Sequence, residues 1–152
     1  MNLAHGLGRA AAVAALTAAP LALSGTARAA TYDGQDPIAG GCASSAITAE
    51  SAPIYRGDGA QVGTIQLRYS TSCRTVWARI LSPAFSSGVA FVYRNTGGAE
   101  GCPANGNTLT WSSTLGAYTC YTPMLNDANV TSYADGTINL HTGAVFGQTG
   151  SY

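Results

Sequence analysis

The sequence LRYSTSCRTVWAR, residues 67–79, joins two candidate strands through a short polar turn. The first candidate, Val62–Tyr69, alternates between apolar and polar residues, and the second is Thr75–Leu81. Alternation with a period of two is typical of a strand that buries one of its faces. We therefore predict an antiparallel hairpin whose turn is Ser70–Cys73.

The register of this hairpin determines which side chains lie together. A turn at Ser70–Cys73 pairs Leu67 with Val76 and Gln66 with Trp77, since paired residues of antiparallel strands face each other. Alternation then places four residues on the core face: Ile65, Leu67, Val76 and Ala78. The opposite face carries five polar or amphipathic side chains: Thr64, Gln66, Arg68, Trp77 and Arg79.

The two guanidinium groups beside Trp77 allow two interpretations. An exposed Trp77 would form, with Arg68 and Arg79, a platform for a sugar, a carboxylate or an acidic side chain of a partner. A Trp77 covered by another layer would be a core residue with the arginine stems lying over it. The sequence leaves both open, and Trp111 and Tyr118 are weaker candidates for such a binding surface.

The rest of the chain also consists of short runs separated by turn residues, which is typical of an all-β domain. Val89–Tyr93 is nearly all apolar, which predicts a strand buried on both faces. Asp135-Gly136 is predicted as a two-residue hairpin turn between Tyr133-Ala134 and Thr137-Ile138. The remaining predicted strands are Thr108–Trp111 and Ala117–Tyr121, joined as a hairpin, and Ala144–Phe146. We predict a small antiparallel barrel or a two-layer sandwich.

Residues 1–29 have the features of a secretory signal. Arg9 precedes the uncharged run Ala10–Leu23, and Ala27-Arg28-Ala29 offers small residues for cleavage. No second apolar run is long enough to span a membrane. We therefore expect residues 30–152 to form a single secreted, extracellular domain.

The four cysteines predict two disulfides in an exported chain. Three pairings are possible, and we favour Cys42–Cys73 with Cys102–Cys120, because each cysteine then pairs with its neighbour along a β meander. The chain-entropy model gives about 3–4 kcal/mol of stabilisation for each bridge. A zinc site is disfavoured, because the sequence contains no CxxC pair.

Composition excludes some classes of function. The chain has 152 residues, of which 9% are charged, and its formal net charge is +0; a nucleic-acid binder would need a basic surface. His141 is the one histidine beyond the predicted leader, there is no GxSxG motif, and the carboxylates are scattered. We predict no catalytic residues, metal or cofactor.

Several of these segments together resemble the YjfA-like family, a domain of unknown function in small exported bacterial proteins. The resemblance rests on Asp33–Ala43, Gly63–Ser70, Cys73 and Trp77-Ala78-Arg79. It implies export and supports the pairing of Cys42 with Cys73, but it implies no activity. The absence of Lys and the bias toward Ala, Gly and Arg are typical of an actinobacterial source.

These observations favour a non-catalytic module that binds an extracellular protein or a cell-envelope glycan, although the partner is unknown. An alternative is a proteinaceous inhibitor of an extracellular hydrolase, with Asn95–Asn107, closed by Cys102, as its inhibitory loop. A third hypothesis is a small hydrolase that uses His141 and a carboxylate.

Overall fold

The computed structural model describes residues 32–152, so the predicted signal at residues 1–29 lies outside the described residues. The described chain forms strands and turns, with the short 3₁₀ helix η2 (Cys42–Ser45) near its start. The strands are β1 (Ala46–Tyr55), β2 (Gln61–Ser70), β3 (Thr75–Ser82), β4 (Gly88–Arg94), β5 (Ala99–Cys102), β6 (Thr110–Ser112), β7 (Ala117–Tyr121), β8 (Leu125–Asn126), β9 (Ser132–Leu140) and β10 (Gly143–Gln148).

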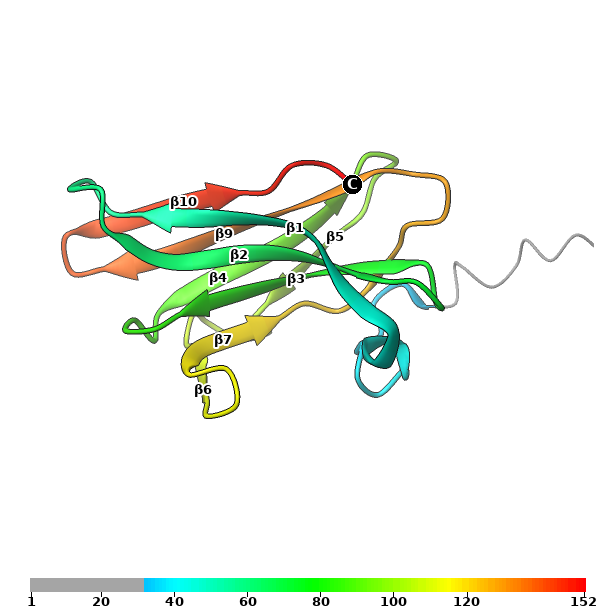
Figure 1. Cartoon of the computed structure of the whole chain (residues 1–152), viewed down its shortest axis with the longest axis horizontal. Helices are drawn as coiled ribbons and strands as arrows, with labels where there is room; N and C mark the ends of the chain where they lie inside the picture. The colour runs from blue at the N-terminus through cyan, green and yellow to red at the C-terminus, as the bar shows by residue number, and fades with distance from the viewer. Residues whose placement is uncertain (1–31) are drawn as a thin grey trace, which may run out of the picture.

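The strands form two antiparallel sheets that pack face to face (Figure 1). The first sheet has the order β1-β2-β3-β7-β6, and β8 also pairs with β3. The second sheet has the order β10-β9-β4-β5. The predicted all-β class is confirmed, and of the two predicted architectures the structure is the two-layer sandwich rather than the barrel.

The β2–β3 hairpin forms where it was predicted, but its register differs by two residues. Ser70 pairs with Thr75, and Arg68 pairs with Trp77. The turn is therefore residues 71–74, one residue later than predicted. A shift of two residues keeps every side chain on its face, because the side-chain period of a strand is also two.

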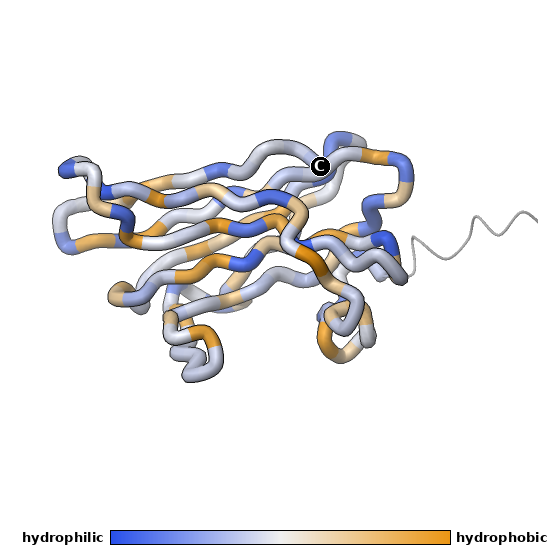
Figure 2. Tube along the Cα trace, in the orientation of Figure 1, coloured by the Kyte–Doolittle hydropathy of each residue, from blue (hydrophilic) through white to orange (hydrophobic). Residues whose placement is uncertain are grey.

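The main core lies between the two sheets. All four residues predicted for the core face of the hairpin are fully buried: Ile65, Leu67, Val76 and Ala78. The second sheet contributes Ala90, Val92, Ala134 and Ile138 to the same cluster. Hydrophobic and hydrophilic positions follow one another along these strands (Figure 2), as expected when each strand buries one face.

A second, smaller core lies on the outer face of the first sheet. The N-terminal segment 32–45 folds over this face and packs Cys42 against Trp77 and Met124. Trp77 is 4% exposed, so the interpretation with an exposed indole is wrong and the covering layer is this segment. Two backbone hydrogen bonds fasten the segment, from Gly34 N to Met124 O and from Met124 N to Gln35 O, each 2.8 Å long.

Both predicted disulfides are present, and they have different roles. Cys42–Cys73 ties the N-terminal segment to the β2–β3 turn. Cys102–Cys120 joins β5 of the second sheet to β7 of the first sheet. One bridge therefore holds the covering segment in place, and the other links the two layers of the sandwich.

Two local predictions are wrong. Asp135-Gly136 is not a turn, because β9 continues through it and the hairpin comes later, where Leu140 pairs with Gly143. The strand β4 is not buried on both faces, because Phe91 is 38% exposed on the outside of the second sheet. Because Phe91 faces solvent, β4 needs only one apolar face, unlike β3, whose outer face is covered by the segment 32–45.

Candidate functional site

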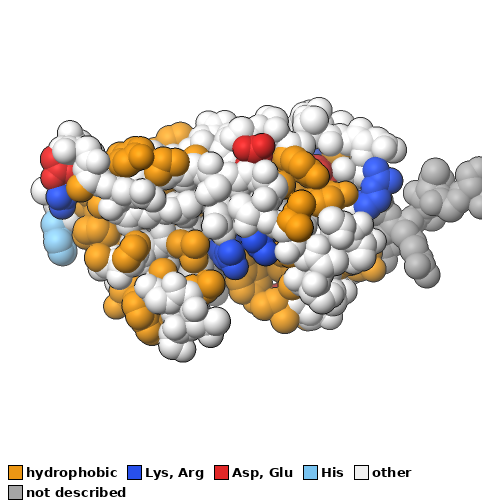
Figure 3. Space-filling model, in the orientation of Figure 1, with side chains coloured by type: hydrophobic (Ala, Val, Ile, Leu, Met, Phe, Trp, Pro, Cys, Tyr) orange, Lys and Arg blue, Asp and Glu red, His pale blue; other side chains and the backbone are white. Residues whose placement is uncertain are grey.

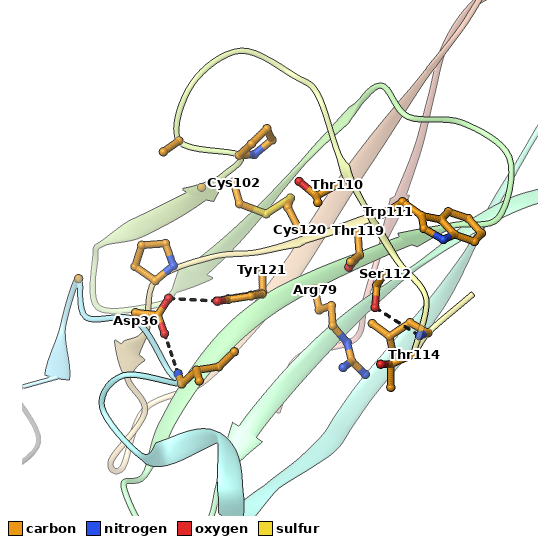
Figure 4. Close-up of a pocket in the computed structure, with 17 residues that line it drawn as sticks. Asp36, Arg79, Cys102, Thr110, Trp111, Ser112, Thr114, Thr119, Cys120 and Tyr121 are labelled. Atoms are coloured by element: carbon orange, nitrogen blue, oxygen red, sulfur yellow. Dashed lines mark hydrogen bonds between the residues drawn. A yellow bond between two sulfur atoms is a disulfide. The ribbon is translucent and has the colours of Figure 1, made fainter. Parts of the chain in front are cut away.

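An open groove of about 780 Å³ lies beside the outer face of the first sheet, along β3, β7 and β6 (Figure 4). Its walls are the N-terminal turn, which contributes Asp36 and Ile38, and residues 102–104 at the end of β5. In Figure 1 the N-terminal segment and the β6–β7 hairpin project from the same side of the sheet. Its volume and mixed lining make the groove a candidate binding site.

Arg79 and Tyr121 lie opposite each other on β3 and β7, so both side chains leave the outer face of the sheet together. The half-buried Arg79 guanidinium donates to Gln66 Oε1 from Nε at 3.0 Å and from Nη2 at 2.7 Å. Burial lowers the pKa of Arg79, and the nearby charge of Arg68 lowers it further. Because the ordinary pKa of a guanidinium is far above neutral, Arg79 remains a cation in the groove despite this shift.

Asp36 supplies the carboxylate of the groove, and three donors hold it. Its Oδ1 accepts the backbone N–H groups of Ile38 at 2.8 Å and Ala39 at 2.9 Å, and its Oδ2 accepts the Tyr121 hydroxyl at 3.2 Å. The Ala39 N–H is the largest cause that lowers the pKa of Asp36. Asp36 is therefore ionised and acts as the acceptor that shapes the N-terminal turn.

Hydroxyl side chains line the groove next to Arg79. They are Thr110, Ser112, Thr114 and Thr119 (Figure 4). The Thr119 hydroxyl donates to Ile80 O at 2.6 Å, and the Ser112 hydroxyl accepts the Leu115 N–H at 3.3 Å. Each hydroxyl has further donor or acceptor capacity, so this side of the groove can hydrogen-bond a polar ligand.

Trp111 and Tyr118, the weaker sequence candidates, pair with each other at the edge of the sheet. Trp111 is 50% exposed, and its ring centroid lies 5.0 Å from that of Tyr118. Trp111 lines the end of the groove but points away from Arg79 in Figure 4, because successive residues of β6 face opposite sides. Leu115 and Ile38 add exposed apolar surface to the rim.

A smaller cleft of about 150 Å³ shares Arg79, Ile38 and Tyr121 with the groove, and Arg68 reaches into it above the buried Trp77. Arg68 donates to the Thr48 hydroxyl and, at 3.3 Å, to Ala46 O. Figure 3 shows basic side chains side by side in the middle of this face, bordered by hydrophobic ones. Of the three residues in the predicted platform, Arg68 and Arg79 therefore line the same cleft, whereas the Trp77 indole is buried.

The groove lining does not include the histidine that was considered for a catalytic role. His141 is exposed in the β9–β10 turn, outside the groove lining. Within residues 32–152, no three His, Cys, Asp or Glu residues are grouped closely enough to hold a metal ion. No helix in the same part of the chain is long and apolar enough to cross a membrane.

Sequence reasoning missed Tyr121 and Asp36 as site residues. In the sequence, Asp36 lies within Asp33–Ala43, which carries the family resemblance, and Tyr121 ends a predicted strand. Neither was a candidate site residue. The β3–β7 pairing brings Tyr121 beside Arg79, and no local pattern in the sequence predicts that pairing.

Comparison with known proteins gives a family but no activity. The family described as "Protein of unknown function (DUF2690)" matches residues 30–135. The "Uncharacterized protein YjfA" of Bacillus subtilis (strain 168) is 35% identical over 127 residues, which is 80% of this chain and 80% of the relative. No solved structure matches.

Proposed function

The chain belongs to the family of proteins of unknown function DUF2690, and we propose that it is a non-catalytic binding module that works outside the cell or in the cell envelope. In this proposal residues 1–29 direct export, and residues 30–152 form the secreted domain. The two disulfides support an oxidising compartment, where such bridges form and persist.

The observation that carries the proposal is the groove on the first sheet. Its lining combines exposed apolar side chains with the Arg79 guanidinium and four hydroxyl groups. Binding sites are typically concave and mostly apolar, with a few well-placed polar groups that orient the ligand. An extended polymer from the cell envelope suits the shape, because the groove is open along its length.

The acidic group of the groove supports binding rather than hydrolysis. Glycoside hydrolysis needs two carboxyl groups that face each other, and the groove lining contains one, Asp36. That carboxylate is occupied by two backbone N–H groups and the Tyr121 hydroxyl. A ligand held here would be released unchanged.

Cosedimentation with isolated bacterial cell walls tests this proposal. We expect the wild-type protein to sediment with the walls, and Tyr121→Ala to remain in the supernatant. The matched control is Tyr55→Ala, since Tyr55 is 52% exposed on β1 and does not line the groove. Equal sedimentation of both variants, or release of wall fragments by the wild type, would contradict the proposal.

An inhibitor of an extracellular hydrolase remains the second candidate, and one feature favours it. The predicted loop Asn95–Asn107 is not a single loop, because Ala99–Cys102 forms β5. Its last part, residues 104–107, is exposed beyond Cys102, which the disulfide to Cys120 anchors to β7. Inhibitors present such a fixed loop to an enzyme cleft. A panel of secreted serine proteases and metalloproteases that keep full activity at a molar excess of the protein would exclude this candidate.

A further inference from the structure

Building on the proposed function, we infer that the groove binds an acidic saccharide whose carboxylate or phosphate lies between Arg79 and Arg68. The groove would hold the sugar rings, and the smaller cleft that shares Arg79, Ile38 and Tyr121 with it would hold the negative group. The inference deepens the proposed function by naming the class of ligand.

The first argument is the charge of the cleft. Ion pairs in residues 32–152 join Arg56 to Asp58 and Asp33 to Arg94, and neither includes Arg68 or Arg79. The acceptors of these two guanidinium groups are neutral: an amide oxygen, a hydroxyl and a backbone carbonyl. Two like charges close together repel each other, and an anion between them would relieve that repulsion.

The second argument is the donor capacity of the two arginines. Each guanidinium carries five N–H donors in a planar fork that matches carboxylate and phosphate groups. Arg79 uses Nε and Nη2 on Gln66 Oε1, so its Nη1 group is available to a ligand. A hydrogen bond between ionised groups in a half-buried cleft is stronger than one between neutral groups.

The Asp36 carboxylate on the groove wall does not cancel this preference. Its two oxygens accept the N–H groups of Ile38 and Ala39 and the hydroxyl of Tyr121. These donors compensate its charge locally, whereas the charges of Arg68 and Arg79 have no acidic partner among the described residues.

The lining favours a saccharide over an acidic peptide. The hydroxyls of Thr110, Ser112, Thr114 and Thr119 both donate and accept, as sugar hydroxyls do. Tyr121 and Leu115, which are 37% and 42% exposed, offer apolar surface for the C–H faces of sugar rings. A peptide would gain most from an unpaired strand edge; the groove meets such an edge only at β6, whereas Arg79, Thr119 and Tyr121 line it from the sheet's face on β3 and β7.

Titration calorimetry with defined probes tests the inference. The probes are tetragalacturonate and its neutral methyl ester, phosphorylated maltotetraose and neutral maltotetraose, and tetraglutamate. We expect one of the two acidic saccharides to bind at least about tenfold more tightly than its neutral counterpart, a factor that corresponds to about 1.4 kcal/mol. Binding should weaken as salt is added, because salt screens partly exposed charges. The preferred acidic probe also shows whether carboxylate or phosphate is recognised.

Two variants of Arg79 locate the anion, and Arg56→Gln is the control. Arg79→Gln should lose at least about tenfold in affinity for the acidic saccharide and much less in affinity for its neutral counterpart. Arg79→Lys keeps the charge but not the planar fork, so it should bind with intermediate affinity; it also serves if the Gln variant fails to fold. Arg56 pairs with Asp58 in the exposed β1–β2 turn, so Arg56→Gln should bind as the wild type does.

A failure of the anion subsite can be distinguished from a failure of the proposed function. Equal affinity of both acidic saccharides and their neutral counterparts, or an Arg79→Gln variant that binds the preferred acidic saccharide normally, overturns the anion subsite. Sedimentation with cell walls would then still support the binding module. Preference for tetraglutamate overturns the saccharide assignment. Absence of binding to every acidic probe overturns the inference, and the Tyr121→Ala sedimentation result then decides the proposed function separately.

Discussion

At the scale of single residues, Trp77 shows that a covering segment can bury a side chain on the outer face of a sheet. It lies on the outer face of the first sheet, where a two-layer sandwich would expose it to solvent. The N-terminal segment covers it instead, with Cys42 and Met124 in contact. The indole therefore contributes apolar burial to stability, and the ligand contacts that we propose fall to Arg68 and Arg79.

We predict that Trp77→Ala strongly destabilises the protein. Trp77 is 4% exposed, and replacing a buried Trp by Ala typically costs about 3–5 kcal/mol, since it removes apolar burial and leaves a cavity. Urea unfolding followed by circular dichroism measures this loss. Trp111→Ala is the matched control, because Trp111 is 50% exposed and its loss should change the free energy of unfolding by less than about 1 kcal/mol. Equal midpoints for the two variants would contradict a covered Trp77.

At the scale of elements, strands with a strong pattern were predictable from the sequence. Val62–Tyr69 and Thr75–Leu81 match β2 and β3 within one residue at each end. β7 has the predicted bounds, β6 begins two residues later than its predicted strand, and β10 contains the predicted Ala144–Phe146. These elements bury alternate side chains or end at short turns, so local sequence is sufficient to predict them.

The elements that were missed have weak local patterns. β1 runs from Ala46 to Tyr55 at the edge of its sheet, and Ile54 is its only fully buried residue. β5 contains Ala99, Glu100, Gly101 and Cys102, which carry no apolar alternation. Such strands are defined by their partners β2 and β4, so their sequence alone does not predict them.

The candidate site was predictable only in part for the same reason. Alternation along one hairpin was enough to place Arg68 and Arg79 on one face. The opposite wall comes from residues 34–38, and the floor includes Tyr121 from β7. These segments meet through the β3–β7 pairing and the folding of the N-terminal segment over β3, which are long-range contacts.

The Cys102–Cys120 bridge leads to a prediction at this scale. Replacing both cysteines by Ser should lower the free energy of unfolding by about 3 kcal/mol, because the bridge closes a loop with a sequence separation of 18. Thermal unfolding measures the loss.

The comparison is the Cys42→Ser, Cys73→Ser pair, which frees the segment over Trp77 but leaves the two sheets linked. We expect its circular dichroism at low temperature to retain the strand signal and its tryptophan emission to shift to the red. An unchanged melting temperature for the Cys102→Ser, Cys120→Ser protein would show that the bridge adds no stability.

At the scale of the whole molecule, the close approach of chain segments depends on glycines inside the strands. Gly136, expected from the sequence to form a turn, lies in β9 and faces the other sheet. A Cβ atom there would lie 3.0 Å from Ile80 Cδ1 and 3.1 Å from Ile65 Cδ1. The glycine is required by packing across the sandwich, not by a turn.

Gly63 in β2 makes an even closer approach, and it gives the last prediction. A Cβ atom at this position would lie 2.3 Å from Ile138 Cδ1 and 2.7 Å from the backbone oxygen of Leu81. The Ile138 side chain can rotate, but the carbonyl belongs to the neighbouring strand β3, so the sheet itself must move. Gly63→Ala should therefore destabilise the protein by about 1–3 kcal/mol, the usual cost of overpacking. The matched control is Gly57→Ala in the β1–β2 turn, where no heavy atom lies within 4 Å of the added carbon. The same urea midpoint for both variants would show that β2 and β3 have room for a methyl group at this position.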